Sequence, residues 1–147
     1  MFPDDDLRRL LRRLVRLSGL LEPHDHAGVR ATASEVFALG ELVEAGTLSQ
    51  QELAERLGLE KSTVSRLVAG MVARGWLSRA RDPANRRIYR LSLTGDGEAA
   101  ARRVGEYFHA RHAELLGALT PAERRGLMLG LAGLARATGE IRERGAG

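Results

Sequence analysis

Residues 49–94 read SQQELAERLGLEKSTVSRLVAGMVARGWLSRARDPANRRIYRLSLT, and this stretch decides the fold. Ser49 and Glu52 have the spacing of a capping box, in which each side chain binds the other residue's backbone N–H. A short helix is therefore expected over 49–58. A second helix is expected over 61–74, closed by a glycine. Two short helices joined by a tight glycine turn are typical of a helix-turn-helix.

The small and apolar residues of this stretch fit two helices that pack closely. Ala54 offers a small side chain at the crossing, and Gly58 follows four residues later, where a left-handed turn is expected. Val64 and Leu67 come next and are expected to face the core. Three leucines complete the apolar set: Leu53, Leu57 and Leu59. The spacing predicts a helix-turn-helix whose second helix packs on the core through Val64 and Leu67 and exposes its opposite face.

A β-hairpin is predicted directly after these helices. Residues 77–81 and 88–93 are expected to form its two strands, since Tyr89, Leu91 and Leu93 alternate with polar residues. The intervening stretch, Asp-Pro-Ala-Asn-Arg-Arg over 82–87, has the composition of a turn. The hairpin would complete a winged helix-turn-helix.

The positive charge of the chain is concentrated in the same stretch. Residues 49–93 hold nine basic and four acidic groups, a net charge of +5, whereas the whole chain carries +4. A surface that faces phosphates would have this distribution. A solvated basic face is the alternative when charge alone is considered.

The second helix is predicted to read the major groove of DNA. Its outward, N-terminal residues are Lys61, Ser62, Thr63, Ser65 and Arg66. Short hydroxyl side chains allow close approach to the groove, and an arginine can bind a guanine edge or a phosphate. Two plainer interpretations are helix capping for Ser62 and Thr63, and a solvated side chain for Arg66.

The tip of the hairpin is predicted to enter the minor groove. Arg86 and Arg87 lie in its turn. The strands add three more arginines: Arg79, Arg81 and Arg90. An arginine-tipped ribbon suits the negative potential of a narrow minor groove. An ordinary surface hairpin is the plainer interpretation, although such hairpins seldom gather five arginines.

Further helices are expected on both sides of this unit. Leucines at helical spacing predict a helix over 7–21, and the stretch 22–28 is expected to be a plain connection. Capping boxes begin helices at Thr32 and Thr120, and a long helix is expected over 94–119. Residues 142–147 are expected to fray. The helix over 32–46 is expected to place five apolar residues in contacts: Val36, Phe37, Leu39, Leu42 and Val43.

The stretch as a whole resembles the winged helix of the MarR family. The matching motifs are Ser62-Thr-Val-Ser-Arg-Leu-Val68, Arg74-Gly-Trp-Leu77, Asp82-Pro-x-x-Arg-Arg87 and Leu93-Thr-x-x-Gly97. The resemblance implies that Ser62, Thr63, Ser65 and Arg66 meet the major groove and that Arg86 meets the minor groove. The family often has aspartate where this chain has Asn85, so a salt bridge that braces the wing is expected to be absent.

The fold class that follows is mainly α with a small β-hairpin wing. One domain over 1–147 is expected, with a winged helix-turn-helix over 32–97 flanked by dimerisation helices over 7–21 and 98–143. Leucine stripes on the flanking helices predict a two-fold homodimer, which would bind a pseudo-palindromic operator. The resemblance also implies a small phenolic or other aromatic effector; its identity and its binding residues stay open.

Different classes of function receive little support from the sequence. The chain has no cysteine, nucleophile elbow, P-loop, dinucleotide-binding pattern or HExxH motif, so neither catalysis nor a cofactor is expected. A winged helix that binds proteins usually lacks these arginines, and an RNA-binding surface needs stacking aromatics. No metal site is predicted, although zinc binding by His24, His26, His109 or His112 stays open. The absence of any long apolar run or signal peptide predicts a cytoplasmic protein.

Overall fold

The computed structural model describes residues 4–18 and 24–145 of the chain. By its internal contacts the chain divides into two compact units, residues 1–108 and residues 109–147. Among the described helices, none combines the length and the apolar character that a membrane span requires.

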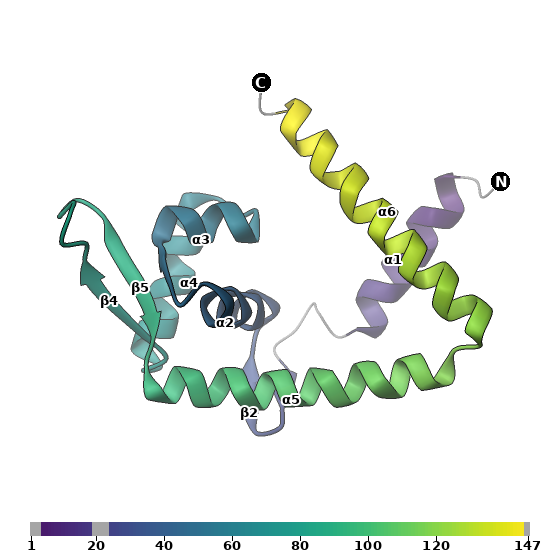
Figure 1. The fold of residues 1–147 in the computed structure, drawn as a ribbon, viewed down its shortest axis with the longest axis horizontal. Helices are drawn as coiled ribbons and strands as arrows, with labels where there is room; N and C mark the ends of the chain where they lie inside the picture. Colours follow the sequence, from purple (N-terminus) through teal and green to yellow (C-terminus); the bar gives the residue numbers. More distant parts are fainter. Residues whose placement is uncertain (1–3, 19–23, 146–147) are drawn as a thin grey trace. The chain divides into compact units, whose positions relative to one another are not determined.

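The first unit holds most of the elements and the whole winged helix. Its elements are α1 (Asp4–Leu17), β1 (His24–His26), β2 (Val29–Ala31), α2 (Ala33–Ala45), β3 (Thr47–Ser49), α3 (Gln50–Leu57), α4 (Lys61–Ala73), β4 (Leu77–Arg81) and β5 (Tyr89–Leu93). The long helix α5 (Gly95–Ala118) follows, and α6 (Pro121–Gly145) belongs to the second unit. Figure 1 shows the β4–β5 hairpin extending beyond α3 and α4 as a wing.

The wing belongs to a three-stranded antiparallel sheet in the order β3-β5-β4. Leu91 of the central strand pairs with Leu48 of β3 on one side and with Arg79 of β4 on the other. The two wing strands confirm the hairpin prediction. The third strand, β3, was missed because three residues are too few to show an alternating pattern.

The core of this unit lies between α2, α3, α4 and the sheet. Its largest fully buried side chains are Leu39, Leu42, Leu53, Val64, Val68, Met71 and Leu91. Burial of one such side chain contributes about 1.5–3 kcal/mol to folding. Leu67, Leu57 and Leu59 pack partly buried against this cluster, as their spacing predicts. The winged helix-turn-helix fold is therefore confirmed.

The three capping boxes begin their helices as predicted. At Thr32, the hydroxyl accepts the N–H of Glu35, and the carboxylate of Glu35 accepts the N–H of Thr32 at 2.8 Å. Ser49 and Glu52 form the same pair at α3. Thr120 and Glu123 form it at α6, where the first helical residue is a proline.

The ends of the chain differ from the prediction. The first helix begins at Asp4, three residues early, and ends at Leu17; the predicted positions 19–21 lie outside the described residues. The predicted fraying over 142–147 is wrong for its first part, since α6 continues through Gly145. Residues 146 and 147 lie outside the described residues.

The predicted plain connection over 22–28 is also wrong where the structure describes it. β1 and β2 form a small antiparallel hairpin, with His26 opposite Val29. The carboxylate of Asp25 accepts the N–H of Gly28 at 2.8 Å, and Gly28 has a φ of 85° that favours glycine. Each strand has three residues, so the sequence carries no alternating pattern to reveal it.

Two of the five apolar residues expected to make contacts on α2 are exposed. Phe37 is 58% exposed and Val43 is 61% exposed. The reason is that α2 buries only the side that carries Ala38, Leu39 and Leu42. Phe37 lines a surface pocket together with Leu57 and Leu59.

Gly97 packs directly against the backbone of Trp76, and this close approach gives a stability prediction. A Cβ at position 97 would clash with the carbonyl oxygen of Trp76, a backbone atom that cannot rotate away. We expect Gly97→Ala to lower the free energy of unfolding by about 1–3 kcal/mol, as overpacking does. Urea unfolding measures the change.

The matched control lies two residues earlier on the same helix. A Cβ at Gly95 would meet no atom within 4 Å. Gly95→Ala should change the free energy of unfolding by less than about 1 kcal/mol. Equal losses in the two variants would contradict the close approach at Gly97.

Candidate nucleic-acid interface

The turn between α3 and α4 has the geometry that its sequence predicts. Gly58 adopts the left-handed conformation, with φ 65° and ψ 33°. The N–H of Leu59 donates to the carbonyl of Ala54 at 3.1 Å, which closes the end of α3. Ala54 and Val64 are both buried at this crossing. The tight crossing fixes the direction in which α4 leaves the core.

The first two turns of α4 present an open polar surface. Lys61, Ser62, Ser65 and Arg66 are exposed, and Thr63 is half-buried. The N-cap residue is Glu60, whose side chain makes no capping hydrogen bond, so Ser62 and Thr63 do not cap the helix. Within the described part of the chain, none of the five predicted side chains has an internal hydrogen bond or ion pair. This surface is available for a partner.

Three of the nine basic groups in residues 49–93 pair with acidic side chains of the protein. Arg56 binds the carboxylate of Glu41 at 2.9 Å, and that hydrogen bond raises the pKa of Arg56. Arg74 binds Glu35 at 3.1 Å and lies 3.6 Å over the ring of Trp76. Arg90, the third, also pairs with acidic side chains.

The other six basic groups of this stretch, all of it described, have no acidic partner. Two of them, Lys61 and Arg66, lie on α4. Arg79 and Arg81 stack on the ring of Tyr89 at 4.6 and 4.3 Å. Arg86 and Arg87 are exposed at the wing tip. The uncompensated charge thus lies on α4 and the wing, the two parts predicted to contact DNA.

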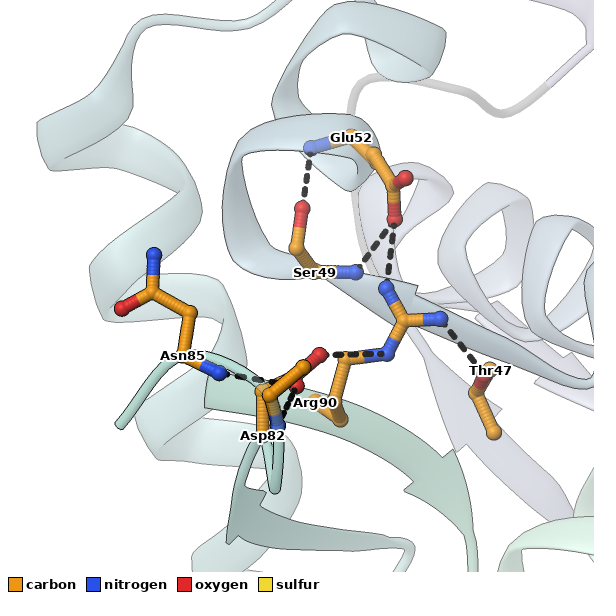
Figure 2. Close-up of polar contacts among 7 residues, drawn as sticks. Thr47, Ser49, Glu52, Asp82, Asn85 and Arg90 are labelled. Atoms are coloured by element: carbon orange, nitrogen blue, oxygen red, sulfur yellow. Dashed lines mark hydrogen bonds and ion pairs between the residues drawn. The ribbon is translucent and has the colours of Figure 1, made fainter. Parts of the chain in front are cut away.

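The turn of the wing is held by side-chain oxygens. A carboxylate oxygen of Asp82 accepts the N–H groups of Ala84 at 2.7 Å and of Asn85 at 3.2 Å (Figure 2). The amide oxygen of Asn85 accepts the N–H of Arg87 at 3.1 Å. The N–H of Ile88 donates to the carbonyl of Asn85 at 2.9 Å. Local hydrogen bonds therefore hold the backbone that presents Arg87.

The predicted absence of a wing-bracing salt bridge is wrong. Asn85 forms no ion pair, as an amide must, but Asp82 pairs with Arg90 at 3.8 Å. Arg90 also binds Glu52 at 3.3 Å and the hydroxyl of Thr47 at 3.1 Å (Figure 2). Arg90 is one of the three strand arginines counted with the wing, and it is bound to the protein. The sequence does not reveal this role, because it depends on strand register.

The histidines do not share one environment. His26 is buried, and its ring packs on Tyr107 and Phe108 with centroids 5.2 Å apart in both cases. His24, His109 and His112 are exposed. In the part of the chain that the structure describes, no three histidine or acidic side chains are grouped as a metal ion would need.

A family model and a curated relative both match this chain. The family model described as the MarR family matches residues 31–88. The HTH-type transcriptional repressor MdtR of Bacillus subtilis (strain 168) is 30% identical over 104 residues, which cover 71% of this chain. The match spans 66% of that repressor's length, just under two thirds.

Solved structures agree with this likeness. The PcaV transcriptional regulator from Streptomyces coelicolor, in complex with its natural ligand, is 27% identical with a TM-score of 0.71, covering 92% of this chain and 93% of that one. A MarR mutant from E. coli complexed with operator DNA has a TM-score of 0.76 and covers 88% of this chain and 93% of that one. Its 23% identity supports the fold alone.

The capping carboxylate of Glu52 gives a pH prediction. The hydrogen bond from the Ser49 N–H is the main cause that lowers the pKa of Glu52 below 4.5, and Arg90 lowers it further. A lowered pKa in the folded state means that the ionised carboxylate stabilises the fold above pH 4.5, and that this stabilisation is lost as the pH falls. The stability difference between wild type and Glu52→Gln should therefore narrow as the pH falls from about 6 to about 3.

Urea unfolding at a series of pH values measures this difference. Glu60→Gln is the matched control, since it removes the same charge from an N-cap residue that makes no capping bond. A Glu52→Gln difference that stays constant over the whole pH range would contradict the role given to the carboxylate.

Proposed function

The chain belongs to the MarR family, and we propose that it is a transcriptional repressor that binds a pseudo-palindromic DNA operator as a homodimer. The single observation that carries the proposal is the sorting of charge in residues 49–93. Three arginines pair with carboxylates of the protein, while the exposed charges without acidic partners gather on α4 and the wing. The proposed action is binding in the cytoplasm, with no catalytic step.

We assign the major groove to α4. Lys61, Ser62, Thr63, Ser65 and Arg66 lie in its first two turns, and their side chains have no internal partners to give up on binding. An α-helix fits the major groove, where a guanidinium can donate two hydrogen bonds to a guanine. Hydroxyl groups bind base edges or phosphates at short range.

We assign the minor groove to the wing tip. Arg86 and Arg87 project from a turn that Asp82 and Asn85 hold in place. Arginine in a narrow A·T-rich minor groove meets enhanced negative potential, which favours such sequences without base-specific hydrogen bonds. The two contacts together would place one winged lobe across neighbouring grooves.

The terminal helices supply the proposed dimer contacts. On α1, Leu10, Leu14 and Leu17 are 59%, 60% and 70% exposed. No residue of α6 is buried within the described part of the chain, although the helix carries a leucine-rich stripe. The stripe consists of Leu127, Leu131, Leu134 and Ile141. A two-fold partner is the commonest way to cover such surfaces.

A dimer also offers a route for regulation by a small molecule. Two copies of α4 must lie about 34 Å apart, or a multiple of that distance, to enter successive major grooves on one side of B-DNA. A ligand that favours another spacing by a few kcal/mol would release the operator. The PcaV regulator was solved with a natural ligand, which supports an effector for this chain without identifying one.

Selection of bound fragments from genomic DNA tests the function most broadly. The full-length protein should recover sequences that share an inverted repeat, and sedimentation should show two chains on each duplex. Recovery of unrelated sequences, or tight binding by a single chain, would contradict the proposal.

Arg66 gives the sharpest prediction for the major groove. We expect Arg66→Ala to weaken binding to the selected duplex by about 1–3 kcal/mol and to relax the preference at one base pair of each half-site. Fluorescence anisotropy with duplexes substituted at single positions measures both effects.

Arg56→Ala is the matched control for this variant. It removes an equal charge from the same stretch, but Arg56 is already paired with Glu41. Its effect on affinity should stay below about 0.5 kcal/mol, as for most surface substitutions. Equal losses in the two variants would indicate a response to net charge and would exclude a specific contact by Arg66.

A further inference from the structure

Arg90 stands at the point where the wing leaves the body of the lobe. It belongs to the central strand β5 and pairs with Ser49 of β3 on one side and with Ala80 of β4 on the other. The β3 strand pairs only with residues 90–92 of β5. Beyond Arg90, toward the tip, the wing is therefore a two-stranded ribbon, and such ribbons are marginally stable on their own.

The guanidinium of Arg90 joins three elements at this point. One terminal nitrogen binds Glu52 of α3 at 3.3 Å, and the other binds the hydroxyl of Thr47 of β3 at 3.1 Å. The inner nitrogen, Nε, lies 3.8 Å from the carboxylate of Asp82 at the start of the wing turn. All three contacts are visible in Figure 2.

Both acidic partners of Arg90 are themselves fixed by backbone groups. Glu52 accepts the N–H of Ser49 at 2.6 Å, so it is tied to the start of α3. Asp82 accepts the N–H groups of Ala84 and Asn85, so it is tied to the turn that carries the exposed arginines. Because Arg90 bridges these two carboxylates, it holds the wing turn in a defined orientation relative to the start of α3.

We propose that Arg90 is a positioning residue, which sets the orientation of the wing tip relative to α3 and α4 so that the wing and α4 engage DNA together. The inference rests on the proposed DNA-binding function and deepens it. Arg90 itself contacts no DNA; it acts through Arg86 at the tip. A planar guanidinium suits the role because its nitrogens diverge in fixed directions, whereas a lysine ammonium is a single point.

The positioning role differs from a contribution to stability. Arg90 is partly exposed, and exposed ion pairs contribute little to folding. Loss of the link should therefore leave the unfolding midpoint of the protein nearly unchanged. It should instead reduce the contribution that Arg86 at the wing tip makes to DNA affinity.

A double-mutant cycle between Arg90 and Arg86 tests the inference. The affinity of full-length wild type, Arg86→Ala, Arg90→Met and the double variant is measured on the duplex recovered by genomic selection. We expect Arg86→Ala to weaken binding about tenfold in the wild-type background and less than about threefold when residue 90 is methionine, since coupled residues are not additive.

Two further variants make the cycle specific. Arg56→Met removes another ion-paired arginine, one that binds Glu41 and no residue of the wing, so Arg86→Ala should keep its full effect beside it. Arg90→Lys retains the charge but not the three-way geometry, and should also reduce the effect of Arg86→Ala. It serves as the readout if Arg90→Met fails to fold.

The outcomes separate the inference from the proposed function. An equal loss on Arg86→Ala with arginine, methionine or lysine at position 90 would overturn the positioning role and leave DNA binding intact. No loss on Arg86→Ala in the wild-type background would remove the wing contact itself, and the positioning role with it. The positioning role is supported if Arg86→Ala weakens DNA binding fully in the wild-type and Arg56→Met proteins, and only slightly when residue 90 is methionine or lysine.

Discussion

The pairing of arginines with carboxylates that already cap helices organises the winged lobe. Glu35 and Glu52 each close the first turn of a helix, and each then binds an arginine from far along the chain, Arg74 and Arg90 respectively. A carboxylate held by a backbone N–H is a fixed acceptor, so the arginine that binds it is fixed as well. These pairs connect separate segments and determine which positive charges are left without an acidic partner.

The sequence predicts the local structure well because local signals determine it. The capping boxes at Thr32 and Ser49, the left-handed turn at Gly58 and both wing strands follow from side-chain chemistry within a few residues. The short strand β3 and the β1–β2 hairpin escape prediction, because three-residue strands carry no pattern. The role of Arg90 escapes it for another reason, since the register that brings it to Glu52 is set by tertiary packing.

The winged lobe exposes positive charge, whereas the terminal helices expose apolar side chains. Within the described part of the chain, α1 and α6 bury almost none of their leucines, whereas α2, α3 and α4 share a close-packed core. The sequence predicts the leucine stripes, but periodicity alone does not distinguish a stripe that packs inside the chain from one that packs on a partner. In the proposed dimer, apolar contacts between the terminal helices set the distance between the two charged DNA-binding surfaces.

Hydroxyl-radical footprinting on the selected duplex reports directly on the wing contacts, because the radical cleaves the backbone from the minor groove. We expect protection in two minor-groove segments, symmetric about the operator centre, where the two wings lie, and we expect Arg86→Ala to lose protection in both. Protection of one segment only, or a pattern that Arg86→Ala leaves intact, would contradict DNA recognition by a symmetric pair of arginine-tipped wings.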